Sequence, residues 1–226
     1  MIAFSRIISL VLCTASIVCG NTGHDSELIY KCGGTDKKRI ALTFDDGPHP
    51  QHTREIISIL EDYDVKATFF VIGKNAEEYP DIVKKEAENG YEIGNHTYTH
   101  PKIPKISPLS LENEIEKGED ALFKITGERP AIFRPPGGFC NKGVGNVALK
   151  KNYSIILWTV DTRDWEIPST EKIVATVKKN IRPGAIILFH DYVFGESNTP
   201  EALRIIVPYI LSEGYEIVTV SELLEL

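Results

Sequence analysis

The stretch RIALTFDDGP, at residues 39–48, begins as a short apolar run and ends in two adjacent aspartates followed by Gly-Pro. Six similar runs follow, at residues 65–72, 91–94, 131–134, 153–160, 184–189 and 215–220. Several of them, such as residues 185–189, are almost continuously apolar, which is typical of strands buried on both faces of a parallel sheet. We therefore expect residues 39–44 to form the first of seven buried strands.

Helix-like stretches separate these runs, at residues 52–62, 76–89, 110–125, 143–151, 170–180 and 200–213. Three of them end in a glycine just before the next run, at Gly90, Gly127 and Gly214, as helices commonly do. Strands that alternate with helices pair in parallel through crossover connections. The pattern predicts an α/β fold, an irregular (distorted) β/α barrel with about seven parallel strands, and leaves an open doubly wound sheet as the alternative.

Composition sets limits on the partners. The chain has 226 residues, with 25 Lys and Arg against 32 Asp and Glu, and a formal net charge of −7. A nucleic acid or an anionic membrane surface would require a basic face, so neither is an expected partner. We expect one domain at residues 39–226, preceded by a polar extension at residues 21–38.

The N-terminus has the features of an export signal. Arg6 precedes an apolar run at residues 7–19, and small residues suit cleavage near Gly20-Asn21. The run is short for a membrane span, so residues 1–20 are predicted to be a secretory signal peptide, with an uncleaved anchor as the alternative. We expect a secreted protein or one at the cell surface or cell wall.

Export bears on the cysteines and on glycosylation. Without residues 1–20 the chain retains Cys32 and Cys140, and an even pair in an exported protein favours a disulfide over two thiols. Asn152 begins a glycosylation sequon. Asn95 begins another, which we expect to be inaccessible because it overlaps the candidate site described next.

Polar residues follow five of the predicted strands at the point where each strand ends. In parallel α/β folds the functional groups gather at the carboxyl ends of the strands. The sequence therefore predicts one functional edge, formed by Asp45 and Asp46, His96 and His100, Arg134, Asp161 with Asp164 and Trp165, and His190 with Asp191.

Part of this set is suited to a metal ion. Adjacent aspartates before Gly-Pro are commonly just a turn, but two carboxylates at a buried strand end repel each other and favour a cation. His96 and His100 are four positions apart, which would place both imidazoles on one side of a helical turn. Two histidines and one aspartate form a site with open positions that suits zinc, iron(II) or cobalt.

The order of the motifs resembles the polysaccharide deacetylase family of carbohydrate esterases, which includes chitin and peptidoglycan deacetylases. The resemblance spans residues 39–224 and rests on five ordered motifs: Thr43-Phe44-Asp45-Asp46-Gly47-Pro48, His96-Thr97-x-x-His100, Arg134-Pro135-Pro136, Asp161 to Trp165, and Leu188-Phe189-His190. Each motif alone is weak. Five in order at suitable spacing are specific.

The resemblance implies a substrate and a role for each residue. The substrate would be an acetylated polysaccharide, an N-acetylglucosamine polymer such as chitin or peptidoglycan, which loses its N-acetyl groups by hydrolysis. One divalent metal, usually zinc, would be held by Asp46, His96 and His100. Further roles are implied for the neighbouring residues: Asp45 as the general base toward a metal-bound water, His190 as the general acid, Arg134 as the partner of Asp45, Asp164 as the partner of His190, and Trp165 with Leu188 as an apolar slot for the acetyl methyl group.

One position departs from the family pattern. An aromatic residue, usually Tyr, commonly follows the two prolines of the third motif, and here the residue is Gly137, followed by Gly138 and Phe139. Gly137 keeps the backbone N–H that would face the oxyanion but removes an aromatic wall, which Phe139 could partly replace. Two alternatives therefore stand beside the deacetylase: a carbohydrate-binding or wall-associated protein with little activity, and an amidase or esterase with another substrate. A glycoside hydrolase that pairs Asp45 with Asp164 is disfavoured, because it leaves the two histidines without a role.

Overall fold

The computed structural model describes residues 29–226, so the predicted signal peptide at residues 1–20 lies outside the described residues. The strands are β1 (Ile29–Tyr30), β2 (Arg39–Asp45), β3 (Thr68–Val71), β4 (Glu92–Asn95), β5 (Ile132–Phe133), β6 (Ser154–Ile156), β7 (Val160–Asp161), β8 (Ile186–His190) and β9 (Glu216–Ile217). The helices are α1 (His52–Asp62), α2 (Gly73–Glu78), α3 (Pro80–Glu88), α4 (Pro108–Thr126), α5 (Lys142–Lys150), α6 (Thr170–Asn180), α7 (Thr199–Ser212) and α8 (Val220–Leu224). Short 3-10 turns are η1 (Ile103–Lys105), η2 (Pro136–Gly138) and η3 (Asp164–Glu166).

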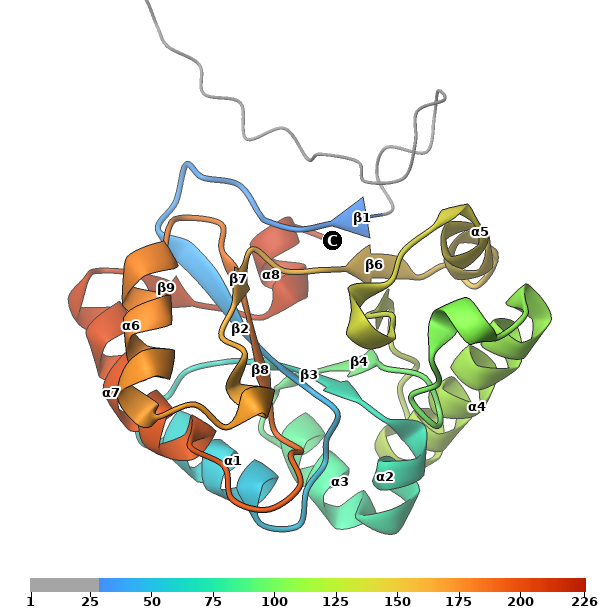
Figure 1. The fold of residues 1–226 in the computed structure, drawn as a ribbon, viewed down its shortest axis with the longest axis horizontal. Helices are drawn as coiled ribbons and strands as arrows, with labels where there is room; N and C mark the ends of the chain where they lie inside the picture. Colours follow the sequence, from blue (N-terminus) through green and yellow to red (C-terminus); the bar gives the residue numbers. More distant parts are fainter. Residues whose placement is uncertain (1–28) are drawn as a thin grey trace, which may run out of the picture.

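The strands form one curled parallel sheet surrounded by helices. Its order is β1-β6-β5-β4-β3-β2-β8-β7, and β9 pairs with the beginning of β2. In Figure 1 the long strand β2 crosses the middle of the molecule, while α6 and α7, α1 to α3, and α4 and α5 lie around the outside. The predicted distorted β/α barrel is confirmed, and the doubly wound alternative is wrong.

The alternation of side chains along β2 explains how one strand serves both the core and the site. Ile40, Leu42 and Phe44 are completely buried in the large apolar cluster shared with the outer helices. Ala41 belongs instead to the cluster inside the barrel. Since successive side chains on a strand point to opposite faces, Thr43 and Asp45 share the inner face with Ala41.

The run at residues 153–160 was predicted to be one strand, and this prediction is wrong. The run forms two strands, because β6 pairs with β5 while β7 pairs with β8. These strands lie near opposite ends of the sheet order, so the intervening residues 157–159 connect the two sides of the curled sheet. The run contains no Gly or Pro, which explains why apolar periodicity did not reveal the bend.

The helix boundaries agree with the prediction in some places and differ in others. Helices α1 and α6 have the predicted bounds. The single helix expected at residues 76–89 is two helices, because α3 begins at Pro80 and the preceding Tyr79 has non-helical angles of φ −129° and ψ 58°. A residue before proline is driven away from the helical region. Strand β1 and helix α8 were not predicted.

The predicted disulfide between Cys32 and Cys140 is not present in the structure. The backbone of Cys32 forms an antiparallel bridge with Ala185, just before β8. The side chain of Cys140 instead packs against the apolar cluster beneath α4 and α5. Cys32 is therefore anchored beside β8 and Cys140 at the cluster of α4 and α5, contacts that sequence spacing does not show.

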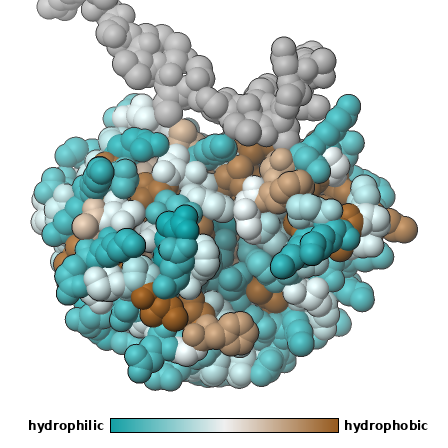
Figure 2. All heavy atoms as spheres, in the orientation of Figure 1, coloured by the Kyte–Doolittle hydropathy of each residue, from teal (hydrophilic) through white to brown (hydrophobic). Residues whose placement is uncertain are grey.

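The two glycosylation sequons differ in their accessibility, on a surface that is mainly hydrophilic (Figure 2). Figure 2 shows mainly hydrophilic residues on this face, with apolar ones interspersed. Among residues 29–226, no helix is both long enough and apolar enough to span a bilayer. Asn95 is completely buried, as expected, whereas Asn152 is exposed and its glycosylation stays a prediction.

Candidate functional site

Five strand ends place the predicted polar residues at one edge of the barrel. Asp45 is the last residue of β2, and His190 is the last residue of β8. His96 directly follows β4, Arg134 directly follows β5, and Asp164 begins η3 after β7. The parallel register then sets these ends side by side, since Asp45 pairs with His190 across β2 and β8.

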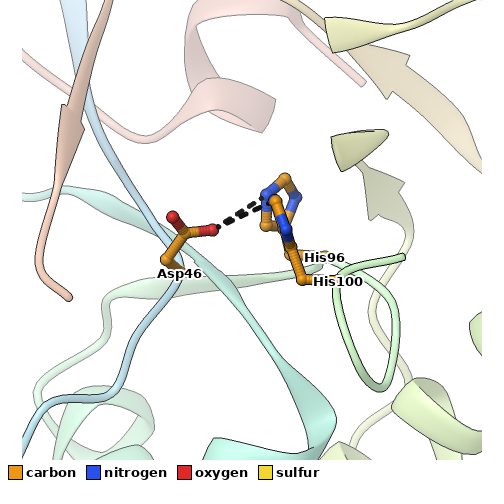
Figure 3. Close-up of side chains that lie close together, drawn as sticks. All are labelled: Asp46, His96 and His100. Carbon is orange, nitrogen blue, oxygen red and sulfur yellow. Dashed lines mark ion pairs between the residues drawn. The ribbon is translucent and has the colours of Figure 1, made fainter. Parts of the chain in front are cut away.

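Asp46, His96 and His100 form a compact triad. Oδ1 of Asp46 lies 3.3 Å from Nε2 of His96 and 3.4 Å from Nε2 of His100. One ligand atom from each of the three residues lies within 4.8 Å of the others. Figure 3 shows the carboxylate of Asp46 pointing toward the two imidazole rings, with both ion pairs dashed.

The donor set of the triad fits a divalent metal ion. Oδ1 of Asp46 is buried and has no hydrogen-bond partner among the described residues. Nδ1 of His96 donates to the carbonyl oxygen of Arg134 over 2.7 Å, so Nε2 presents its lone pair toward Asp46. Two imidazole nitrogens and one carboxylate oxygen directed at a common point are the ligands of zinc and similar ions.

The backbone at the triad is strained. Asp46, Thr97 and His100 have positive φ angles of 77°, 70° and 55°. For residues other than glycine such conformations cost on the order of 1–3 kcal/mol each, and they cluster at functional sites. The two imidazoles converge, with ring centroids 5.0 Å apart, but residues 97–102 are not a helix. The four-residue spacing therefore predicted correctly that the two imidazoles lie close together, but the helical turn on which that prediction was based is absent here.

Mutual charge effects set the protonation of the triad. Burial raises the pKa of the Asp46 carboxyl, but the close approach and charge of His96 and the charge of His100 outweigh it, so this pKa is lowered overall. Burial and the neighbouring His96 lower the pKa of His100, which favours the neutral imidazole that a metal requires. Burial lowers the pKa of His96, but Asp45 and Asp46 reverse this and raise it, so a proton competes with a metal there.

Asp45 is held by a completely buried arginine. Nη1 of Arg134 donates to Oδ1 of Asp45 over 2.6 Å and to Thr43 over 2.8 Å. Its Nε and Nη2 donate to the carbonyls of Ile156 and Leu157, at the bend between β6 and β7. Since a buried charge needs a partner with good geometry, the buried Arg134 pairs with Asp45 and fixes its orientation. Oδ2 of Asp45 remains directed toward the triad, 3.8 Å from Nε2 of His96.

His190 is fixed by Asp164 on the other side of the site. Oδ1 of Asp164 accepts from Nδ1 of His190 over 2.8 Å, and Oδ2 accepts from the backbone N–H of His190 over 2.8 Å. Thr199, at the start of α7, donates its hydroxyl to Oδ2 over 2.7 Å. Burial alone would lower the pKa of His190, but the hydrogen bond and charge of Asp164 raise it to about 9.

The predicted substrate-binding residues have different surroundings. Leu188 is 3% exposed in β8, whereas Trp165 is 50% exposed beside Asp164. Gly137 has a φ of 63°, and a Cβ added there would meet no atom within 4 Å. Phe139 is 37% exposed and lines the same pocket as Gly137. The space next to Gly137 is therefore open.

The sequence did not reveal the residues that hold the loop after β2, which contains Asp46 and Gly47. The Thr53 hydroxyl donates to Oδ2 of Asp191 over 2.6 Å, and a Cβ on Gly47 would lie 2.0 Å from the same oxygen. Asp191 therefore packs directly against Gly47, and burial raises the pKa of this aspartate to about 7. Asn75 also donates to the carbonyl of Asp46 over 2.8 Å. No local signal marks Thr53 or Asn75, although Asp191 belongs to the predicted strand-end set.

Comparison with known proteins agrees with this geometry. The profile of the polysaccharide deacetylase family matches residues 33–156. A peptidoglycan-N-acetylglucosamine deacetylase of Bacillus cereus is 43% identical over 191 residues, which cover 84% of this chain and 89% of the relative. A crystal structure of a peptidoglycan N-acetylglucosamine deacetylase bound to 4-naphthalen-1-yl-N-oxidanyl-benzamide superposes with a TM-score of 0.86 at 37% identity, covering 89% of this chain and 94% of that one.

A third relative is described as a pseudoenzyme. The structure of a CE4 family pseudoenzyme from Bacillus anthracis superposes with a TM-score of 0.82 at 31% identity, covering 88% of this chain and 69% of that one. A mutant of the same pseudoenzyme is described as having restored enzymatic activity. Similarity in fold and sequence therefore extends to proteins with and without activity.

Proposed function

The chain belongs to the polysaccharide deacetylase family, and from this membership we propose that it hydrolyses N-acetyl groups on an N-acetylglucosamine polymer of the peptidoglycan type. The observation that carries the proposal is the triad, in which a buried and unpartnered oxygen of Asp46 faces two imidazole nitrogens at 3.3 and 3.4 Å. Relatives named as peptidoglycan deacetylases support the choice of polymer over chitin.

Asp46, His96 and His100 would hold the metal, which we propose to be zinc, with cobalt or iron as alternatives. A divalent ion held there would polarise the acetyl carbonyl and make water a stronger acid. Asp45 then takes the proton from the attacking water. Its Oδ1 is bound to Arg134, so Oδ2 is the atom that accepts the proton.

His190 would protonate the amine as it leaves. Its Nδ1 is bound to Asp164, so Nε2 is the atom that carries the transferable proton. The raised pKa of about 9 keeps this imidazole charged at neutral pH. The backbone N–H of Gly137 would face the oxyanion, and Leu188 with Trp165 would receive the acetyl methyl group.

We further propose export of the chain by residues 1–20, with residues 39–226 acting at the cell wall or outside the cell. Relatives that act on peptidoglycan support this location, because their substrate is a wall polymer.

The test is acetate release from a panel of acetylated glycans by protein loaded with zinc, cobalt or iron. Asp45→Asn and His190→Ala should each lower the rate by about 10²- to 10⁴-fold, the usual size of a general acid or base contribution. Asp62→Asn, an exposed aspartate on α1, makes the same chemical change away from the site and should leave the rate unchanged.

Similarity to the CE4 pseudoenzyme favours a second candidate, a glycan-binding protein without turnover. Binding of the same glycans without acetate release from any of them, with every metal tried, would establish that candidate and refute the deacetylase.

A further inference from the structure

A surface pocket of about 400 Å³ opens directly beside the triad. One wall is the segment that follows the second histidine, residues 100–105, and the other is formed by Pro136, Gly137 and Phe139. His100 belongs to both the pocket and the triad, so the pocket is continuous with the place where the acetyl group would be hydrolysed.

The walls of the pocket are suited to sugar rings. Pro101, Pro104 and Phe139 supply apolar surface, and Phe139 is 37% exposed. Gly137 adds no side chain, and a Cβ there would meet no atom within 4 Å, which leaves room for a ring. Apolar walls with a few polar groups that fix orientation are the usual composition of a ligand site.

Besides His100, the polar side chains that line this pocket are those of Lys102 and Lys105, which are both exposed. Neither ammonium forms an ion pair in the described part of the chain, whereas Lys150 and Lys151 are paired with glutamates. Glu114, the carboxylate that contacts this loop, is bound to the N–H and hydroxyl of Thr99. The lysines therefore keep two positive charges beside the site of a chain whose net charge is −7.

We propose that this pocket is a subsite for a carboxylate-bearing sugar, the neighbour of the N-acetylglucosamine that is deacetylated, with Lys102 and Lys105 binding the carboxylate. The proposal rests on the proposed function and narrows its substrate class. A glycan in which N-acetylglucosamine alternates with a carboxylated sugar fits the two ammonium groups, whereas an uncharged homopolymer has no group for them to bind. Unneutralised charge of one sign beside a cleft also attracts the oppositely charged ligand from solution.

The test compares three tetrasaccharides with the metal-loaded protein. The first alternates N-acetylglucosamine with N-acetylmuramic acid, whose lactyl group carries the carboxylate. The second is the same glycan with each carboxylate converted to a carboxamide, and the third is an N-acetylglucosamine homopolymer. KM and kcat are measured by acetate release, at low and high salt.

The variant is Lys102→Gln with Lys105→Gln. Loss of charge-assisted contacts should raise KM for the carboxylate form about 10-fold, with kcat unchanged. KM for the carboxamide form and for the homopolymer should not move, and salt should weaken only the carboxylate form. The matched control is Lys124→Gln with Lys179→Gln, which removes two exposed lysines from α4 and α6 and should behave as wild type.

Equilibrium binding of the same ligands supplies a readout that does not depend on turnover. In an Asp45→Asn background, the lysine pair should weaken binding of the carboxylate form about 10-fold relative to the control pair. Equal affinity of wild type for the carboxylate and carboxamide forms would overturn the subsite and leave the deacetylase intact. Absence of acetate release with all three glycans would instead count against the proposed function, while the binding comparison still decides the subsite.

Discussion

Two aspartates at the same edge of the barrel each face a histidine, and their surroundings are opposite. Asp164 is 3% exposed and accepts hydrogen bonds from the backbone and ring of His190 and from Thr199. Asp46 has a φ of 77°, and its Oδ1 faces two imidazoles without a hydrogen-bond partner in the described residues. The Asp164 region is completed by groups of the chain itself.

The difference separates two kinds of function. A fully hydrogen-bonded carboxylate positions its histidine and sets the protonation of that histidine. A strained carboxylate with free lone pairs and two imidazoles is arranged for a ligand from outside the chain, since buried polar atoms in proteins normally have partners. The comparison therefore predicts that a change at Asp46 alters metal binding, whereas a change at Asp164 alters the pH dependence of the activity.

The largest effect should come from Asp46→Ala. This change removes a metal ligand, so elemental analysis should find about one divalent ion per chain in wild type and almost none in the variant. Loss of the metal should lower acetate release by at least about 10³-fold, because several kcal/mol of transition-state stabilisation disappear. Asp164→Asn is the control and should retain its metal. A fully metallated Asp46→Ala protein would contradict the distinction between the two regions.

An intermediate effect is expected from Asp164→Asn, read as a pH profile. A histidine whose folded pKa is raised stays protonated as pH rises until that pKa is passed, here about 9 against 6.5 unperturbed. Stabilisation of the fold by this pair is complete below pH 6.5 and is lost as pH rises toward 9. Without the carboxylate the pKa falls toward 6.5, so at pH 8 the protonated fraction of His190 drops about 30-fold.

The measurement for this variant is kcat/KM for acetate release across the basic range. Its basic limb should move to lower pH than in wild type. A bound cation lowers the His190 pKa in both proteins, so the direction of the difference is preserved. Basic limbs at the same pH in the two proteins would show that Asp164 does not set the protonation of His190.

The smallest effect should come from Thr199→Val, which keeps the shape of the side chain and removes one hydrogen bond to Asp164. An intramolecular hydrogen bond typically contributes about 0.5–1.5 kcal/mol, and Asp164 keeps its two bonds to His190. We therefore expect kcat/KM to fall by roughly 2- to 10-fold with metal content unchanged. Thr176→Val on α6 also loses a hydroxyl, one that donates to the carbonyl of Lys172, and should leave the rate unchanged. A larger loss from Thr176→Val than from Thr199→Val would refute the role of Thr199.

The site was more predictable from sequence than the details of the fold. Asp45 and His190 end apolar strands, so parallel pairing alone places them at one edge. The contact between Thr199 and Asp164 was harder to predict, because Thr199 lies at a helix start 35 residues away and belongs to no motif. The carbonyls that bind Arg134 lie at the bend between β6 and β7, within a run that alternation reads as one straight strand.

The local geometry of the metal ligands also escaped prediction. Helical spacing does not explain how His96 and His100 are placed. Their positions depend on positive φ angles at Thr97 and His100. The segment with those angles is held by tertiary contacts, such as the backbone N–H of Gly73 donating to the carbonyl of Thr97 over 3.0 Å. Contacts of this kind are not encoded in any short pattern of residue types.

The burial of Asn95 has a consequence for producing the protein. Asn95-His96-Thr97 is a sequon, and a eukaryotic secretory pathway would present it to glycosylation before the chain has folded. A glycan there has no space, because the Asn95 amide donates to Ile115 and Tyr153 in the interior. Removing the sequon through Thr97 would be harmful as well, since the Thr97 hydroxyl accepts from the N–H of His100 over 3.1 Å. A bacterial expression host therefore preserves the triad where a eukaryotic secretory host would divert part of the chains from folding.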